Sequence, residues 1–443
     1  MTHIFSRSCG CLLVGVLLSS VAVLSNRAAR ADEPAKPAAP AKSPFPYIWG
    51  TAYHIPPETN TEEEGYFSLC EGHDGKIYIG TAAFGRNSYL VEFDPKTEKM
   101  RVVVDVHKVC GLPLTPTGMA AQGKIHTRNF VGPSGKIYLG SKQGHPTGKD
   151  DNSVYPGGYL LVYDPATEQT ENLGMPMKGQ GVIDVTADEA RGLIYVITCE
   201  DQHWMLYDMK TKKYRELGPI LRDQPNTIVD SQGRATAITK DYRVARYNPA
   251  TDKVTIDDLL VDGVPFGSAL PQAVHPDWRL AADGHTAYLV VLNDFRMFQI
   301  DLAGPAGKPL VARSLGNRVE GKNADSRGSV AIAPDGRVYS ACRADNATGY
   351  GTGYLHHLSR YTPSTGKLED LGVFTVKNPD FVNWGTDPAD PRPKPRFVHG
   401  FHKLPDGTLT PLHVMLAMIV AHDGTIYGTV LVPFTLLKVE PPK

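Results

Sequence analysis

Short segments in which apolar and polar residues alternate recur along the chain, and a glycine turn divides each of them. One copy, GPSGKIYLGS, ends at Ser141, and six related copies end at Thr81, Thr198, Thr239, Val291, Cys342 and Val430. Their turn glycines are Gly75, Gly135, Gly192, Gly233, Gly284, Gly336 and Gly424. Alternation with a period of two on both sides of an Asp-Gly or similar pair predicts two antiparallel strands joined by a tight hairpin.

A second signature follows five of the seven copies. It reads LVEFDPKTEKM, LLVYDPATEQT, MLYDMKTKKY, VARYNPATDKV and LSRYTPSTGKL, while the fifth copy has the weaker MFQIDLAGPAG. Proline fixes φ and the aspartate side chain caps the turn, so this signature predicts a second hairpin. Each repeat therefore contains four short antiparallel strands.

Seven repeats of four strands are typical of a seven-bladed β-propeller, an all-β fold of four-stranded antiparallel blades. The last copy ends after its third strand, at LLKVEPPK. We expect PYIWGTAYHI, at residues 46–55, to supply the missing strand and to close the ring by joining the two ends of the chain. Residues 45–443 are then one domain, and the 43 glycines and 35 prolines agree with a fold rich in turns.

The N-terminal region is typical of an exported protein. Arg7 precedes the apolar run CLLVGVLLSSVAVL, and ARA before Asp32 has the small residues of a cleavage site. We interpret residues 1–31 as a signal peptide cleaved near Ala31 and residues 32–44 as a disordered linker. The apolar run is too short to span a bilayer, and no second run reaches that length. The mature protein is therefore expected to be secreted or periplasmic, without a membrane span.

Charge and cysteine content narrow the class of protein further. The net charge of −1 over 443 residues gives no indication of a nucleic-acid partner. Four cysteines follow the cleavage site, namely Cys70, Cys110, Cys199 and Cys342. They are too sparse for a disulfide scaffold, and we interpret them as buried free thiols. One disulfide, Cys70–Cys110, is the alternative in an oxidising compartment.

In a propeller the first strand of each blade lines a central channel, and its early residues lie near one mouth. Counting nine residues back from each turn glycine gives Tyr66, His126, Ile183, Gln224, His275, Arg327 and Met415. Arg128 and Asp184 lie within two residues of these positions. The set is unusually polar for innermost positions, and it indicates a binding or active site at this mouth.

The second strand of each hairpin returns to the same mouth. Its end and the following loop carry His145, Glu200, Asp201, His203, Lys240, Tyr242, Asn293, Arg343 and His356. His126 and His145 stand at the two ends of one hairpin, KIHTRNFVGPSGKIYLGSKQGHP, so both can face one pocket. The competing interpretation is structural, because a single inner histidine is more often hydrogen-bonded filler and a single arginine often serves a salt bridge.

A separate segment, RFVHGFHKLPDGTLTPLH, contains His399, His402 and His413. Imidazoles in this pattern can bind Zn²⁺ or Mn²⁺, with His275 or Cys342 as further ligands, although the spacing matches no known zinc finger. The chain has no C-x-x-C-H haem motif. It also has no nucleophile-elbow, Walker A or dinucleotide motif in a strand-to-helix context.

The histidine hairpin resembles part of a known family. An exported seven-bladed propeller with one histidine on an inner strand and another after the next strand resembles polysaccharide lyases of the ulvan-lyase type, and more distantly oligogalacturonate lyases. The specific part of the likeness is KIHT…GKIYLGSKQGHP. The resemblance implies β-elimination on a uronic acid, in which an arginine neutralises the carboxylate and a histidine or tyrosine removes the C5 proton. It assigns His126 and His145 directly.

The remaining assignments follow from blade position. The expected catalytic residues are His126, His145, Tyr242, His275 and Arg327, with Arg343 and Arg246 as competitors for the arginine. The expected substrate contacts are Tyr66, Arg128, Gln224 and Arg343. The function that we expect is β-elimination on a uronic-acid-containing polysaccharide by a monomer.

Two alternatives stay open at this point, because propellers serve many unrelated functions. The first is a non-catalytic propeller that binds a glycan or peptide at the same mouth. The second is a metal-assisted hydrolase or lactonase. The second would need acidic metal ligands in the channel, and the inner set has few.

Overall fold

The computed structural model describes residues 42–61, 65–114, 118–146, 148–223, 226–271, 275–325, 329–381, 401–411, 415 and 417–441, with side chains from residue 67 onward in the second range. The expected signal peptide and most of the expected linker lie outside these ranges. Helical segments in them are η1 (Pro57–Thr59), α1 (Val106–Cys110), η2 (Gly118–Ala120) and α2 (Phe266–Ala269). Strands make up most of the remaining regular structure.

The described residues form six sheets, and the first four follow the repeats closely. The first contains β2 (Gly65–Glu71), β3 (Ile77–Thr81), β4 (Tyr89–Asp94) and β5 (Lys99–Asp105). The second contains β6 (Lys124–Ile125), β7 (Phe130–Val131), β8 (Ile137–Lys142), β9 (Leu160–Asp164) and β10 (Gln169–Asn172). The third contains β11 (Gly181–Asp188), β12 (Leu193–Cys199), β13 (His203–Asp208) and β14 (Lys213–Ile220). The fourth contains β15 (Ile228–Val229), β16 (Ala235–Ile238), β17 (Val244–Asn248) and β18 (Lys253–Asp257).

The last three repeats lie in two larger sheets. The fifth sheet contains β19 (Leu259–Val261), β20 (Val264–Pro265), β21 (Asp277–Leu280), β22 (Thr286–Val290), β23 (Arg296–Asp301) and β24 (Leu310–Asn317). The sixth, ten-stranded sheet contains β1 (Tyr47–His54), β25 (Val330–Ile332), β26 (Val338–Asp345), β27 (Tyr354–Thr362), β28 (Lys367–Val376), β29 (Phe401–Lys403), β30 (Leu409–Pro411), β31 (Met418–Val420), β32 (Ile426–Val430) and β33 (Thr435–Val439).

The N-terminal strand explains why the last two repeats share one sheet. β1 pairs antiparallel with β33, with Ala52 opposite Leu437, as the missing strand of the last repeat was predicted to do. Its first half also pairs parallel with β28, with Ile48 opposite Phe374, which was not predicted. Closure by the N-terminal strand is confirmed. The count of seven blades stays our interpretation of a topology in which β1 merges two of them.

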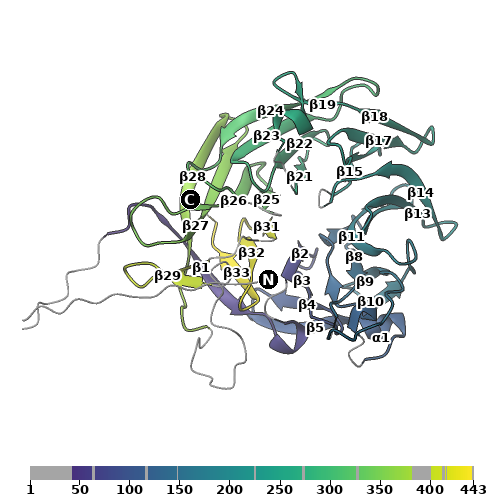
Figure 1. Ribbon diagram of the computed structural model, residues 1–443, viewed down its shortest axis with the longest axis horizontal. Helices are drawn as coiled ribbons and strands as arrows, with labels where there is room; N and C mark the ends of the chain where they lie inside the picture. The colour runs from purple at the N-terminus through teal and green to yellow at the C-terminus, as the bar shows by residue number, and fades with distance from the viewer. Residues whose placement is uncertain are drawn as a thin grey trace, which may run out of the picture. The chain divides into compact units, whose positions relative to one another are not determined.

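The apolar core lies between neighbouring sheets. Leu160 and Ile194 belong to one buried cluster that joins the second and third sheets. Ile79 and Leu436 belong to another, which joins the first repeat to the last. Burying one such side chain is worth about 1.5–3 kcal/mol, so these clusters hold the sheets together. With β2 against β31 and β11 against β8, the repeats follow one another in a closed order, and Figure 1 shows their succession within residues 42–441.

The seven inner hairpins share one turn geometry. In the first, the amide of Gly75 donates to the carbonyl of Gly72 at 2.9 Å. All seven turn glycines have left-handed backbones, with φ from 67° at Gly192 to 86° at Gly424, where other residues are strained. The glycine therefore follows the two central residues of the turn. The hairpin is present as predicted, but its glycine is the fourth residue of the turn. The Asp-Gly pair therefore lies one position further along the turn than was predicted from the sequence.

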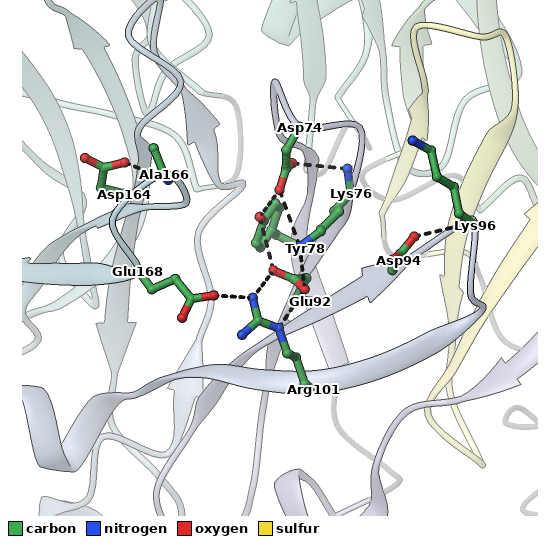
Figure 2. A network of polar contacts seen from close by, with 10 residues as sticks. All are labelled: Asp74, Lys76, Tyr78, Glu92, Asp94, Lys96, Arg101, Asp164, Ala166 and Glu168. Atoms are coloured by element: carbon green, nitrogen blue, oxygen red, sulfur yellow. Dashed lines mark hydrogen bonds and ion pairs between the residues drawn. The ribbon is translucent and has the colours of Figure 1, made fainter.

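The outer turns use the predicted aspartate cap. Asp94 Oδ1 accepts the amide of Lys96 at 2.8 Å, and Asp164 Oδ1 accepts that of Ala166 at 2.9 Å. Figure 2 shows these caps beside a polar network on the first sheet, in which the buried Glu92 receives two hydrogen bonds from Arg101 at 2.8 and 2.9 Å.

The same network joins the first two sheets. Lys76 Nζ donates to Glu92 at 2.9 Å, and Arg101 also reaches Glu168 of the second sheet's outer turn at 2.7 Å. Burial alone would raise the pKa of Glu92, but Arg101 and Lys76 lower it below its ordinary value.

The four cysteines of the described region are free thiols. Cys70, Cys199 and Cys342 are buried, and Cys110 is half-buried. The alternative of a Cys70–Cys110 disulfide is therefore wrong, although both residues contact the same apolar cluster between the first and second sheets. Burial raises the pKa of the Cys110 thiol to about 12.

Candidate functional site

The inner strand that carries His126 is interrupted. The sequence predicts one continuous strand here, but β6 ends at Ile125 and β7 begins at Phe130, and both pair with β8. The side chain of Thr127 replaces one missing backbone bond, because its Oγ1 accepts the amide of Gly140 in β8 at 3.0 Å. Asn129 Oδ1 instead accepts from Ser68 of β2 in the first sheet, at 2.8 Å. The break lets residues 126–129 leave the regular ladder.

His126 is buried at the break. Its residue is 5% exposed, and its ring meets the edge of Phe67 at a centroid distance of 5.5 Å. Burial, followed by the charges of Lys142, Lys124 and Arg128, lowers the pKa of His126 well below its ordinary value. The imidazole is therefore neutral near neutral pH.

His145 is joined to the same place by a lysine. Lys124 Nζ lies 2.9 Å from His145 Nε2. An ammonium group can only donate, so Nε2 accepts here and a neutral His145 carries its proton on Nδ1. The ring of Phe84, which is 38% exposed, lies against His145 at 4.5 Å between centroids. Lys124 therefore contacts His145, and its charge also lowers the pKa of His126.

A second lysine completes this group. Lys142 lies directly opposite Lys124 in the β6–β8 pairing, and its Nζ is 3.5 Å from Glu200. The neighbouring residue at the start of β11 is Gly181, where an added Cβ would come within 2.9 Å of the Lys142 chain. We call Lys124, His126, Lys142 and His145 the cationic cluster.

Tyr242 and His275 belong to another group. Arg222 lies over the Tyr242 ring at 4.6 Å, and Asp223 Oδ2 is 2.9 Å from His275 Nδ1. Burial alone would raise the pKa of Asp223, but His275 and Arg222 lower it. Burial raises the pKa of Tyr242, whose ring stacks on Phe266 of the core.

His275 is not on an inner strand as predicted, because β21 begins at Asp277. Its backbone is left-handed, with φ 47°, and that of Tyr242 is too, with φ 62°. Such conformations cost roughly 1–3 kcal/mol in residues other than glycine, and they concentrate at functional sites. The two residues thus occupy constrained positions, and His275 contacts Asp223 there.

The expected arginines have internal partners. Arg343 pairs with Asp325 at 2.5 Å and lies over Tyr354 at 4.4 Å. Arg246 is buried, pairs with Asp257 and donates to the carbonyl of Gly304, so its role is structural.

Arg128 also has an internal partner, because its Nη2 lies 3.0 Å from Asp277 Oδ1. It contacts Phe67 at 4.8 Å as well, which places it beside His126 across that ring.

Several predicted residues lie outside the described residues. These are Gln224, Arg327, His399 and His413, together with the side chain of Tyr66. Of the predicted metal ligands, His402 is described, and its Nε2 lies 3.2 Å from the carbonyl oxygen of Tyr354. Within the described ranges no group of three His, Cys, Asp or Glu side chains is arranged to hold a metal ion. The metal site stays a hypothesis.

The sequence alone did not lead us to two members of the cationic cluster, Lys124 and Lys142, or to its aromatic neighbour Phe84. Lys124 and Lys142 flank the predicted histidines within the same hairpin, and Phe84 comes from the first repeat. The two lysines could have been predicted from the sequence, because each stands at a strand end that the position of the histidines already assigns to the mouth. Phe84 was not, since its position depends on packing between repeats.

Comparison with known proteins identifies the fold of the chain but not its activity or ligand. No known protein-family model and no curated protein matches it. The WD40 repeats of RRP9 superpose with a TM-score of 0.51 at 9% identity, over 85% of this chain and 94% of that chain. The structure of U3-55K gives 0.51 at 10% identity, over 85% and 95%. A structure of the Mitotic Checkpoint Complex gives 0.50 at 9%, over 96% and 100%.

The chain is therefore a β-propeller by fold. At these identities the likeness carries no activity, so the lyase resemblance stays a hypothesis. No helix within the described ranges has the length and apolarity needed to cross a membrane.

Proposed function

We propose that the protein is a binding propeller whose mouth at the cationic cluster takes an anionic ligand, of which a uronate-bearing glycan is the favoured class. The observation that carries this is the direct pairing of Lys124 with Lys142, with Lys124 only 5% exposed. Like charges opposite one another destabilise a sheet, and burying an ammonium group opposes its charge. Glu200, 3.5 Å from Lys142 Nζ, offsets part of this cost, and an anionic ligand would offset more of it.

The surroundings of the cluster suit a sugar. Phe84 presents a partly exposed aromatic ring beside His145, and aromatic rings offer a rigid apolar contact surface. The imidazole nitrogens supply polar contacts next to it. A ligand with a carboxylate and an apolar ring face would use both features at once.

β-Elimination is the second candidate, and the neutral state of His126 favours it. A neutral imidazole can take the C5 proton of a uronate while the C4–O bond breaks, a C4–C5 double bond forms and the leaving oxygen gains a proton. Lys124 and Lys142 would neutralise the carboxylate as charge develops. His145 would return the proton, because Tyr242 belongs to the separate group around Arg222 and Asp223. Arg327, one of three arginines that the sequence offers for the carboxylate, remains part of this candidate.

One experiment separates the two functions. The protein is titrated calorimetrically with a panel of uronic-acid oligosaccharides, and the same mixtures are followed for the ultraviolet absorbance of an unsaturated product. Binding without product supports the binding propeller. Product that falls by on the order of 10²–10⁴ in rate in His126→Ala, with binding retained, supports elimination. Neither binding nor product from any uronate would overturn the proposal.

We further propose that the protein acts outside the cytoplasm, as the N-terminal sequence predicts. Fractionation of cells that produce the full chain tests this. Mature protein beginning near Asp32 in the periplasm or medium is the expected result. Uncleaved protein in the cytoplasmic fraction would contradict it.

A further inference from the structure

A cavity of about 410 Å³ lies where the inner strands of five repeats converge, toward the hairpin turns. Its lining comes from β2, the break between β6 and β7, β11, β15 and β21. Arg128 in this lining contacts Phe67, which also contacts His126 of the cationic cluster. The residues that matter below are Asn129, Asp184, Thr227 and Arg279, with Arg128 beside them.

Three buried polar atoms in this lining have no hydrogen-bond partner among the residues that the structure describes. They are Asn129 Nδ2, Asp184 Oδ1 and Thr227 Oγ1. The three residues are 7%, 1% and 0% exposed. A buried polar group left without a partner costs about 1–3 kcal/mol, so three of them around one cavity indicate a ligand.

The hydrogen bonds that these three side chains already form show which of their donor and acceptor atoms face the cavity. Asn129 Oδ1 accepts from both Ser68 and Thr127, so the amide nitrogen is the donor that this side chain presents, beside the Cys70 thiol. Asp184 Oδ2 accepts the amide of Thr227 at 3.2 Å, which leaves Oδ1. The cavity therefore presents one amide donor, one hydroxyl and one carboxyl oxygen.

The fixed charges at this end of the cavity favour an anion. Asp277 is completely buried and shares its carboxylate between Arg128 at 3.0 Å and Arg279 at 2.8 Å. Two guanidinium groups on one carboxylate leave a positive excess. Among the described residues, the hydrogen bonds of Arg279 to Asn226, Asp277 and the Trp278 carbonyl all use its Nη1 atom. An inorganic cation would be repelled by the positive charge of the two guanidinium groups and would face the Asn129 amide donor. A cation therefore does not fit this site.

The acidic residues near the turns do not cancel this excess. Asp188 pairs with Arg191 at 3.0 Å and Asp230 with Arg234 at 2.6 Å. Glu189 accepts from Ser134 and from Tyr138. The charges of Asp188 and Asp230 are therefore paired with arginines, and Glu189 directs its carboxylate to the hydroxyl donors of Ser134 and Tyr138. Asp184 Oδ1 has no such partner among the described residues.

We propose that the channel cavity is a second binding site, separate from the cationic cluster, for a small hydroxylated carboxylate. The carboxylate would lie on Arg279 beside Arg128, and its hydroxyl groups would bond Asn129, Thr227 and Asp184. Burial raises the pKa of Asp184 to about 7 despite Arg128 and Arg279, so near neutral pH the carboxyl can donate to the anion.

Calorimetric titration with D-glycerate tests the site, with glycerol and chloride as probes that lack the charge or the hydroxyls. Glycerate should bind and the other two should not. If binding requires protonated Asp184, affinity at about pH 8 should be on the order of tenfold weaker than at about pH 6. Asp184→Asn, whose amide can also donate, should bind glycerate with little pH dependence.

Two further variants locate the binding. Thr227→Val is close to isosteric and should lose on the order of tenfold in glycerate affinity. Lys124→Met removes a charge at the mouth and should leave glycerate affinity unchanged, which separates this site from the proposed function. No glycerate binding, equal binding of glycerol, an unaffected Thr227→Val or equal loss in Lys124→Met would each overturn the channel site.

Discussion

At the residue scale, the chemistry of the candidate site depends on burial as much as on residue type. The sequence predicts His126 and His145 at one mouth, because a hairpin begins and ends there. Lys124 contacts His145, and its charge acts on His126. The sequence does not reveal that Lys124 is buried or that His126 is neutral. His126 is buried at the break at residues 126–129, in a segment that the alternation predicted to be one continuous strand.

Asp184 gives the clearest test at this scale. Its pKa is raised by burial from 3.8 to about 7, so the folded protein binds a proton there that the unfolded chain releases above about pH 4. This contribution to the free energy of unfolding is present below the unfolded pKa and is lost as pH rises through about 7, a change on the order of 4 kcal/mol. Asp184→Asn should remove that loss and be more stable than the wild type at about pH 8.

Urea unfolding at several pH values between about 4 and 8 measures the difference. Asp258→Asn, which changes an exposed carboxylate, is the matched control and should keep the wild-type pH dependence. An Asp184→Asn variant whose pH dependence matches the wild type would show that Asp184 is ionised in the folded protein near neutral pH.

At the element scale, the turns are the best-predicted features and the inner strands the least. Turn residues act locally: Gly75 is needed for its left-handed backbone and Asp94 for its cap, and neither depends on distant packing. Inner strands depend on neighbours across the channel. His275 was placed on such a strand, but the strand begins two residues later, at Asp277.

The Glu92 network tests how two elements are joined (Figure 2). Glu92→Gln leaves Arg101 and Lys76 without their charged acceptor in a buried position, so the free energy of unfolding should fall by about 1.5–3 kcal/mol. Glu168→Gln alters the exposed partner of the same arginine and should cost under about 1 kcal/mol. Because the pKa of Glu92 is lowered, its contribution should disappear as pH falls below the unfolded value.

Chemical unfolding of both variants at neutral pH measures these differences. Equal losses in Glu92→Gln and Glu168→Gln would contradict the distinction between a buried and an exposed acceptor. A Glu92→Gln variant as stable as the wild type would show that the network contributes no net stability.

At the scale of the whole molecule, the repeats predicted both the architecture and its closure. Repetition carries this information because each repeat buries its apolar side chains against the next, so the order in sequence becomes the order in space. The second partner of β1, the edge of β28, was not predictable from the repeat pattern. It depends on how far the N-terminal strand extends past the last repeat.

Closure should be essential for stability. A chain beginning at Pro56 lacks β1 and exposes the edges of β28 and β33, and it should aggregate. Its melting temperature should fall by on the order of 10 °C. A chain beginning at Ala41 keeps β1 and should melt like the longer protein. Equal melting temperatures and solubility for the two chains would contradict the role of β1.

The central claim is that the cationic cluster binds an anionic glycan. Its most direct test is calorimetric titration of the wild type, Lys124→Met and Lys142→Met with trigalacturonate, using the exposed Lys210→Met as a control with the same change in charge. Loss of a charged hydrogen-bond donor should weaken binding by roughly tenfold or more in each cluster variant, and Lys210→Met should bind like the wild type. Unchanged affinity in both cluster variants, or an equal loss in Lys210→Met, would contradict the claim.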